Sequence, residues 1–308
     1  MSTAAAIIVL FAVLAGGAWL AATLDRAALA LAAERPVAVA VMAGPWRRGA
    51  LHLMRQRIRT ERPDATNWRL APAAYLLLAA VGISVVPFAP GFVVADLNAG
   101  IVLWGACEAL TVVVVFLHGW SPNAPLPLIG AYRYVAIGLP VILLSMFVLI
   151  AAALPAGSLS VSAIVDSQAS LWNVVRQPPG LLLFLMLGLS LTLRGPFDYA
   201  DAADLAGGTS AEDSGPAQAA WQAARLAMLV SVSAMASAVF LGGYHGPWLP
   251  GPVWMLLKMA VVLAALVAAT HMVARLPPAR MLTFLWTILL PASFLVLVLV
   301  GAEVLLWK

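Results

Sequence analysis

The 308-residue sequence contains little charge and almost no cysteine. Its only cysteine, Cys107, cannot form an intrachain disulfide, and the four scattered histidines offer no ligand spacing for a metal or redox cluster. Charged residues make up only 10% of the chain, too few for the solvated surface of a soluble globular domain. Segments that alternate between polar and apolar residues, as in a membrane β-barrel, are absent. These absences exclude a disulfide-rich secreted domain and a soluble enzyme.

Long apolar runs take the place of charge. Hydrophobic residues make up 63% of the chain, and its mean hydropathy is +0.99. Because lipid offers no hydrogen bonds to the backbone, apolar runs of this length cross a bilayer as helices. The sequence therefore predicts an all-α polytopic membrane protein with a single membrane domain over residues 1–308. We expect about eight transmembrane helices, near residues 4–24, 71–90, 98–118, 127–153, 179–193, 219–242, 252–273 and 282–306.

The distribution of basic residues predicts the orientation in the membrane. Nine of the 17 lysines and arginines lie between Arg26 and Arg69. The positive-inside rule places this basic loop, residues 34–69, in the cytoplasm, and an even helix count then places both termini outside. The net charge of +4 is in this sense a topology signal, so we expect the lipid bilayer as a partner and no nucleic acid.

A second polar loop, residues 194–216, carries five of the 13 acidic residues: Asp198, Asp201, Asp204, Glu212 and Asp213. Counting the spans places this acidic loop in the cytoplasm, on the same face as the basic loop. Acid clustered beside a lipid-embedded core marks a place where charge, protons or a polar headgroup are handled. Because the two loops have opposite charge, we expect them to dock onto each other or onto a shared soluble partner.

The basic loop also contains an amphipathic pattern. Trp46, Ala50, Met54 and Ile58 recur at helical spacing among arginines. This spacing predicts a helix over residues 46–58 that lies on the cytoplasmic surface of the membrane. Such a helix either anchors the loop to anionic lipid or offers a docking surface to a partner protein of the same complex.

Four charged residues in the apolar runs form a candidate intramembrane proton path: Glu108, Arg133, Arg225 and Lys258. A carboxylate in lipid costs about 2.5–3.5 kcal/mol on insertion, so Glu108 is expected to face protein or water. Arg133 and Arg225 are its candidate counter-charges, and a structural ion pair is the alternative to a proton path. Lys258 lies near enough to a helix end to extend into water. We expect His118, at a span end, to be solvated.

Short motifs along the chain occur in an order that resembles one known family. They include Asp96-Leu97-Asn98, Gly119-Trp120-Ser121-Pro122-Asn123, Gly130-Ala131-Tyr132-Arg133, Arg194-Gly195-Pro196-Phe197-Asp198, Glu212-Asp213-Ser214-Gly215, Trp254-Met255-Leu256-Leu257-Lys258 and Arg275-Leu276-Pro277. The ordered set resembles the H subunit of bacterial respiratory complex I, the family of mitochondrial NADH dehydrogenase subunit one. The resemblance spans nearly the whole chain, and its collinear order makes it specific.

This resemblance implies a non-redox membrane subunit of an NADH:quinone oxidoreductase in the bacterial inner membrane, with no catalytic residue of its own. Quinone would enter where the soluble redox subunits dock, and its reduction would be coupled to proton translocation. The chain would bind no cofactor, because NADH, FMN and the iron–sulfur clusters belong to partner subunits. The residues that match the family's charged positions are Asp25, Arg26, Arg194, Asp198, Asp201, Asp204 and Glu212.

The sequence also departs from the family's pattern. Leu139 precedes Pro140 where the family has a glutamate, the segment 191–193 carries no acid, and Arg225 replaces another glutamate. We therefore expect a divergent member in which docking and quinone contact are better supported than proton coupling. Two alternatives stay open: the membrane anchor of a formate hydrogenlyase or energy-converting hydrogenase, and a structural scaffold without coupling. A secondary transporter is disfavoured because no inverted repeat is apparent.

Overall fold

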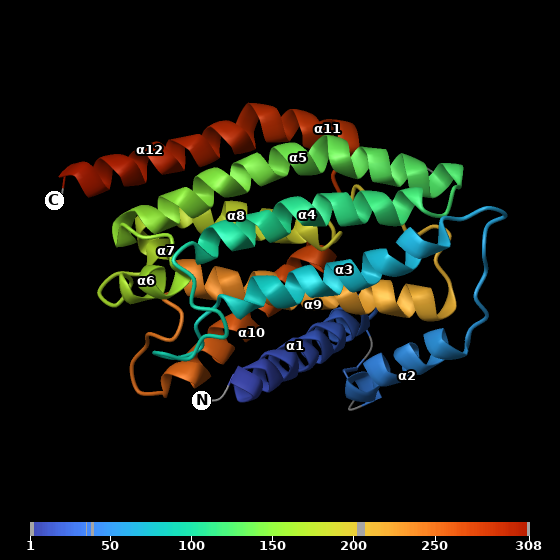
Figure 1. The fold of residues 1–308 in the computed structure, drawn as a ribbon, viewed down its shortest axis with the longest axis horizontal. Helices are drawn as coiled ribbons and strands as arrows, with labels where there is room; N and C mark the ends of the chain where they lie inside the picture. Colours follow the sequence, from blue (N-terminus) through green and yellow to red (C-terminus); the bar gives the residue numbers. More distant parts are fainter. Residues whose placement is uncertain (1–2, 35, 38–39, 202–206, 307–308) are drawn as a thin grey trace.

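In the computed structural model, long helices run side by side along the longest axis of the molecule (Figure 1). The structure describes residues 3–34, 36–37, 40–201 and 207–306. The helices are α1 (Thr3–Ala32), α2 (Ala40–Met54), α3 (Ala65–Ser84), α4 (Gly100–Trp120), α5 (Pro125–Ala153), η1 (Leu154–Ala156), α6 (Val161–Asp166), α7 (Asn173–Arg176), α8 (Pro178–Leu191), α9 (Gly215–Phe240), α10 (Gly251–Met272), α11 (Pro278–Phe284), the π-helical turn η2 (Leu285–Leu289) and α12 (Leu290–Leu306).

The predicted fold class is confirmed. Six helical segments in the described part of the chain are long and apolar enough to cross a membrane: Ala5–Ala32, Gly100–Trp120, Pro125–Ala156, Gly215–Phe240, Gly251–Met272 and Pro278–Leu306. The other two predicted spans coincide with α3, which has 20 residues, and with the apolar α8, which has only 14. Each predicted span falls largely on a helix, but the span predicted at residues 71–90 is wrong in its bounds, because α3 begins at Ala65 and ends at Ser84. The number of helices that cross the bilayer stays a prediction.

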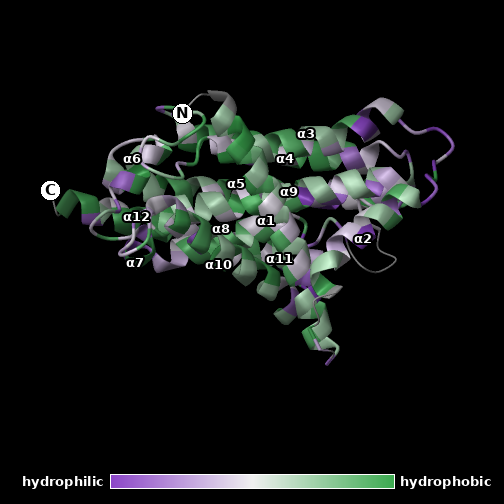
Figure 2. Cartoon of the chain, turned by 90° about the horizontal axis from the view of Figure 1, so that it is seen from below, coloured by the Kyte–Doolittle hydropathy of each residue, from purple (hydrophilic) through white to green (hydrophobic). Residues whose placement is uncertain are grey.

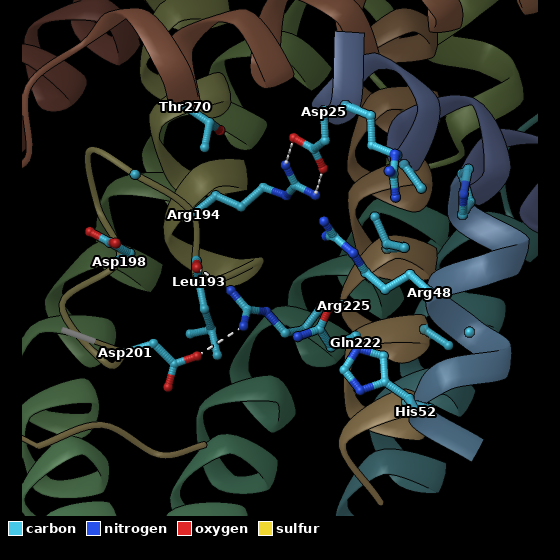
Figure 3. Close-up of a pocket in the computed structure, with 18 of the residues that line it drawn as sticks. Asp25, Arg48, His52, Leu193, Arg194, Asp198, Asp201, Gln222, Arg225 and Thr270 are labelled. Atoms are coloured by element: carbon cyan, nitrogen blue, oxygen red, sulfur yellow. Dashed lines mark hydrogen bonds and ion pairs between the residues drawn. The ribbon is translucent and has the colours of Figure 1, made fainter. Parts of the chain in front are cut away.

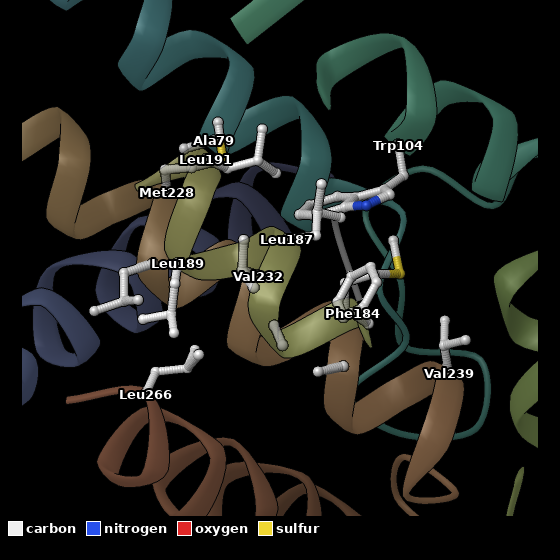
Figure 4. Packing of buried hydrophobic residues seen from close by; sticks show 14 of the residues in the cluster. Ala79, Trp104, Phe184, Leu187, Leu189, Leu191, Met228, Val232, Val239 and Leu266 are labelled. Atoms are coloured by element: carbon white, nitrogen blue, oxygen red, sulfur yellow. The ribbon is translucent and has the colours of Figure 1, made fainter. Parts of the chain in front are cut away.

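Helix α9 forms the centre of the bundle. Every residue from Ala227 to Phe240 is buried, and half of these residues are alanine or serine. Small residues let helix backbones approach closely in a membrane protein. Figure 4 shows Leu187 and Leu191 of α8 packed beside Met228 and Val232 of α9. The helices around α9 thus share one apolar core.

Close packing also explains a glycine in α3. A Cβ added at Gly82 would lie 2.7 Å from the ring of Trp104 on α4. The indole of Trp104 therefore occupies the space that a side chain at Gly82 would fill. This contact lets α3 and α4 pack closely against each other.

Hydrophilic residues gather at one end of the bundle (Figure 2). This polar end carries α2, the beginnings of α3 and α9, and the acidic loop, whereas both termini lie at the opposite end (Figure 1). The arrangement agrees with the predicted alternation of spans. Which end faces the cytoplasm stays a prediction.

The amphipathic helix begins and ends earlier than the sequence predicted. Helix α2 ends at Met54, so the expected helix over residues 46–58 is wrong in its last turn. The reason is a tertiary contact: the backbone N–H of Ile58 donates to Ser214 Oγ at 2.7 Å, which draws the chain out of the helix. Trp46 and Met54 are 73% and 83% exposed, so the apolar side of α2 faces away from the bundle.

The two polar loops contact each other, as expected, but through neutral donors; no ion pair joins them in the described part of the chain. Besides the bond between Ile58 and Ser214, Trp68 Nε1 donates to Asp213 Oδ1 at 3.1 Å. Both contacts join the basic loop, or the helix that follows it, to the end of the acidic loop. These contacts join segments that are about 150 residues apart in the sequence, so the two loops pack together at the polar end.

Candidate functional site

The acidic loop begins with an ion pair to α1. Arg194 donates from Nη1 and Nη2 to the two carboxylate oxygens of Asp25, at 2.8 and 2.7 Å. His271, near the end of α10, shares Asp25 Oδ1 at 3.1 Å. Two-pronged pairs between arginine and carboxylate are stronger and more directional than single hydrogen bonds. Asp25 thus positions the acidic loop, α1 and α10 relative to one another.

A second ion pair joins the acidic loop to the turn between α10 and α11. Arg275 Nη2 lies 3.0 Å from Asp198 Oδ2, where the arginine side chain is 55% exposed and the aspartate only 10%. The backbone N–H of Leu276 also donates to the carbonyl of Pro196 at 3.2 Å. Burial raises the pKa of Asp198 above its ordinary value, and the attraction of Arg275 only partly opposes this.

The third ion pair joins the acidic loop to α9. Arg225 Nη1 donates to Asp201 Oδ2 at 2.9 Å, and its other nitrogens donate to the carbonyls of Thr192 and Leu193. Thr209 and the backbone of Ser210 donate to Asp201 Oδ1. Asp201 is therefore satisfied on both of its oxygens.

The pKa of Asp201 is shifted in the opposite direction to the pKa of Asp198. Burial by itself would raise the pKa of Asp201, but Arg225 and the donors from Thr209 and Ser210 together outweigh it and lower the pKa. Asp201 is held as a carboxylate, whereas Asp198 binds a proton more readily than an ordinary aspartate. The acidic loop thus contains two acids with opposite shifts within four residues.

These ion pairs surround a cavity of about 520 Å³ at the polar end. Figure 3 shows how Asp25, Arg194 and Asp201 face it from α1 and the acidic loop, while Arg48, His52, Gln222 and Arg225 face it from α2 and α9. Its lining also includes Arg26, Asp198, Thr270 and Arg275. Five arginines and three aspartates therefore share one solvent-accessible space, large enough for the polar ring of a small organic ligand.

The structure brings together most of the residues that the sequence singled out. Asp25, Arg26, Arg194, Asp198 and Asp201 all line the cavity. Glu212 is partly buried but does not line it, and Asp204 lies outside the described residues. Arg225, predicted as part of an intramembrane path, belongs instead to this cavity.

Sequence reasoning missed several lining residues. Arg48 and His52 stand one helical turn apart on α2, and Gln222 and Arg225 are three residues apart on α9. Helical spacing of polar side chains was the signal that could have found them. Helical spacing could not have indicated Arg275, because Asp198, with which it pairs, lies in another segment.

His118, which we predicted to be solvated, is buried where α4 meets the acidic loop and α9. His118 Nε2 lies 2.8 Å from Asp213 Oδ2, and both side chains are almost fully buried. The imidazole stacks on Trp221, with ring centroids 3.6 Å apart. The expectation of a solvated His118 is wrong because α9 and the acidic loop close over the end of α4.

The predicted counter-charges of Glu108 are also wrong. Glu108 is buried in α4, where Ser145 Oγ donates to it at 2.7 Å and Trp104 Nε1 also donates. Arg225 pairs with Asp201, and Arg133 donates to the carbonyl of Gly207. Glu108 therefore faces protein, as expected, but neutral donors satisfy it.

Lys258 does not extend into water as expected. Its ammonium group donates to the carbonyls of Leu241, Gly243 and His245, at 2.6, 2.9 and 2.6 Å. It also lies 4.1 Å from the centroid of the Trp172 ring. Lys258 is therefore a buried cation that holds the turn between α9 and α10, at the end of the bundle opposite the cavity.

In the described part of the chain, no three His, Cys, Asp or Glu side chains are placed to hold a metal ion.

Comparison with known proteins shows which family this chain resembles. The model of a family described as NADH dehydrogenase matches residues 4–301. The chain is 35% identical, over 242 residues, to the NADH-quinone oxidoreductase H subunit numbered 1 of Rhodopseudomonas palustris (strain HaA2). The aligned part covers 78% of this chain and 76% of that protein. The family match includes every helix that borders the cavity.

Proposed function

Because this chain belongs to the NADH dehydrogenase family, as a membrane subunit of NADH-quinone oxidoreductase of the H type, we propose that its polar-end cavity admits the quinone headgroup. The single observation that carries this proposal is the cavity of about 520 Å³ lined by three ion pairs and by Arg48 and Gln222. The soluble redox subunits would dock over this end of the bundle and deliver electrons there.

The side chains of the cavity suit a ligand that gains negative charge. Reduction of a quinone places negative charge on its carbonyl oxygens before protons arrive. The guanidinium of Arg48 has no partner among the described residues and points toward the cavity (Figure 3), so it is free to stabilise that charge. The side-chain amide of Gln222 offers a neutral hydrogen-bond donor to a quinone carbonyl. In this proposal the cavity both orients the quinone headgroup and stabilises the negative charge that its reduction creates.

The three ion pairs provide a physical route to proton coupling. A negative charge in the cavity competes with Asp25, Asp198 and Asp201 for their arginines. A carboxylate that loses its guanidinium in a partly buried site gains proton affinity. Asp198 is the acid nearest to binding a proton, because its pKa is already raised by burial. We propose that quinone reduction changes the protonation of these aspartates and so links electron transfer to proton movement.

A cavity-filling substitution tests the quinone site. Ala223 lines the cavity on α9, whereas Ala220, also exposed on α9, does not. In the purified complex, we expect A223F to raise the KM for quinone and to reduce labelling by a photoactivatable quinone on α1, α2 and residues 192–201. A220F is the matched control and should leave both values near those of the wild type. Labelling confined to other subunits, or equal effects of the two variants, would contradict the proposal.

The alternative of a hydrogenase anchor is not carried forward, because both the family model and the similar bacterial protein bear the names of NADH-oxidising complexes. A scaffold without coupling predicts wild-type quinone reduction and proton pumping in D201N, whereas the proposal predicts that both fall.

A further inference from the structure

A second cavity, of about 690 Å³, adjoins the first between α1, α2 and α9. Its charged and polar lining consists of Arg26, Arg47, Arg48, His52, Arg55 and Gln222. No aspartate or glutamate lines it among the described residues. This basic cavity therefore differs from the first one, where aspartates pair with most of the arginines.

The cations of the basic cavity are not neutralised within the described chain. Arg47, Arg48 and Arg55 make no ion pair there, and Arg26 gives a single hydrogen bond to the carbonyl of Gly44, at 3.0 Å. His52 Nδ1 is buried without a hydrogen-bond partner. Several guanidinium groups that converge without an acid repel one another unless an anion joins them. The lining is thus complementary to a negatively charged ligand.

The position of the cavity suggests where that ligand comes from. Leu51 and Val41 of α2 line the cavity beside the arginines. Trp46, Leu53 and Met54 of the same helix are exposed, as expected for a helix that lies in a membrane interface. A ligand bound here would meet both guanidinium groups and aliphatic side chains. Phospholipids have this combination of a charged head and an apolar body.

We propose that the basic cavity binds the headgroup of an anionic phospholipid, with the phosphodiester against Arg47 and Arg55, the two arginines that line this cavity alone. Arginine presents paired N–H donors that match two phosphate oxygens. Basic pockets at the membrane surface favour anionic over zwitterionic lipids, because the net charge of the headgroup decides the attraction. The lipid would neutralise the excess charge of α2 and hold this helix against α9.

The test uses the purified complex in nanodiscs and a photoactivatable phosphatidylglycerol. Arg47 and Arg55 line only the basic cavity, so R47Q/R55Q separates lipid binding from the proposed quinone site. The matched control is R59Q/R62Q, which removes the same charge from two exposed arginines of the basic loop that do not line the cavity. Photoactivatable phosphatidylcholine reports on a neutral headgroup, and inorganic phosphate is added as a competitor.

We expect phosphatidylglycerol to label α2 and the beginning of α9 in the wild type and in R59Q/R62Q. In R47Q/R55Q, binding should weaken about thirtyfold, because each basic residue near anionic lipid contributes on the order of a fivefold gain. Equal labelling by phosphatidylcholine, or equal loss in both double variants, would overturn the proposal. Displacement of the label by inorganic phosphate would also overturn it, since the ligand would then be a soluble anion.

Discussion

Arg194 and Asp25 are joined by two hydrogen bonds of 2.8 and 2.7 Å, although 169 positions separate them in the sequence. His271 reaches the same carboxylate from a third segment. Because one aspartate satisfies both partners, its loss affects the acidic loop, α1 and α10 together. The position of the cavity wall depends on this contact.

We expect D25N to lower quinone reductase activity about tenfold or more, because displaced side chains of the cavity lose alignment with the ligand. The same change should destabilise the protein by about 1–3 kcal/mol, since it leaves a partly buried guanidinium without its carboxylate. Activity and thermal unfolding of the purified complex are the measurements. D96N, which alters an aspartate at the opposite end, serves as control. Wild-type activity and stability in D25N would contradict the role of this pair.

A substitution at Asp201 tests whether quinone reduction is coupled to proton pumping. Because Arg225 holds Asp201 as a carboxylate, D201N removes a negative charge from the cavity wall without changing its size. We expect both quinone reduction and proton pumping to fall, with the larger loss in the protons moved per electron. Reconstituted vesicles with a pH-sensitive dye measure this ratio. If both values stayed at the wild-type level, the chain would act as a scaffold.

The pH dependence of stability should carry opposite contributions from Asp198 and Asp201. Asp198 has a raised pKa, so the native state holds its proton more tightly and stability falls as pH rises from 3.8 through that pKa. Asp201 has a lowered pKa, so its contribution is present above 3.8 and is lost as pH falls further. D198N should remove the first slope and D201N the second. Thermal midpoints between about pH 3 and pH 7 measure both, and identical pH profiles in the two variants would refute the assignment.

His118 should be a structural contact of the polar end. In H118F the ring can still stack on Trp221, but Asp213 loses its 2.8 Å partner while buried. We expect a loss of about 1–3 kcal/mol, the usual cost of an unsatisfied buried polar group. Faster proteolysis within residues 208–214 would show that the acidic loop has come loose. H118Q, which keeps a polar group, should recover part of the stability. Equal stability of H118F and the wild type would argue against the contact.

Lys258 should stabilise the end of the bundle opposite the cavity. K258M leaves three carbonyls of the turn between α9 and α10 without their common donor. Because one of these contacts is buried and the other two are partly buried, we expect a loss of about 2–4 kcal/mol and faster hydrogen exchange within residues 241–250. K258R keeps the charge and should be milder. Unchanged quinone KM in K258M would show that the effect is confined to this end.

The sequence predicted the features that depend on local composition. Apolar runs located the helices, because any segment in lipid must satisfy its own backbone. Charge clustering located the two loops, which do contact each other, although through neutral groups such as Ile58 and Ser214 rather than through opposite charges. The ordered motifs predicted which of the charged residues, from Asp25 to Asp201, belong to one site.

Other features could not be predicted, because they depend on which segments approach each other. Nothing near His118 in the sequence indicates that Asp213 and Trp221 will bury it. Lys258 lies close to a helix end, and only the fold shows that a turn closes over it. Arg225 was predicted to belong to a path inside the membrane. It lines the cavity instead, because the acidic loop folds back onto α9 and Asp201 pairs with it.

The contact between Asp25 and His271 also sets an order of events during biosynthesis. The two residues are 246 positions apart, so Asp25 is made and inserted long before its partner leaves the ribosome. Chains grow and fold from the N-terminus, and early segments wait for late ones. The cavity can close only after α10 is in the membrane. If soluble subunits dock over this end, as we propose, they meet a finished surface only on a nearly complete chain, and a chain truncated before α10 would offer them none.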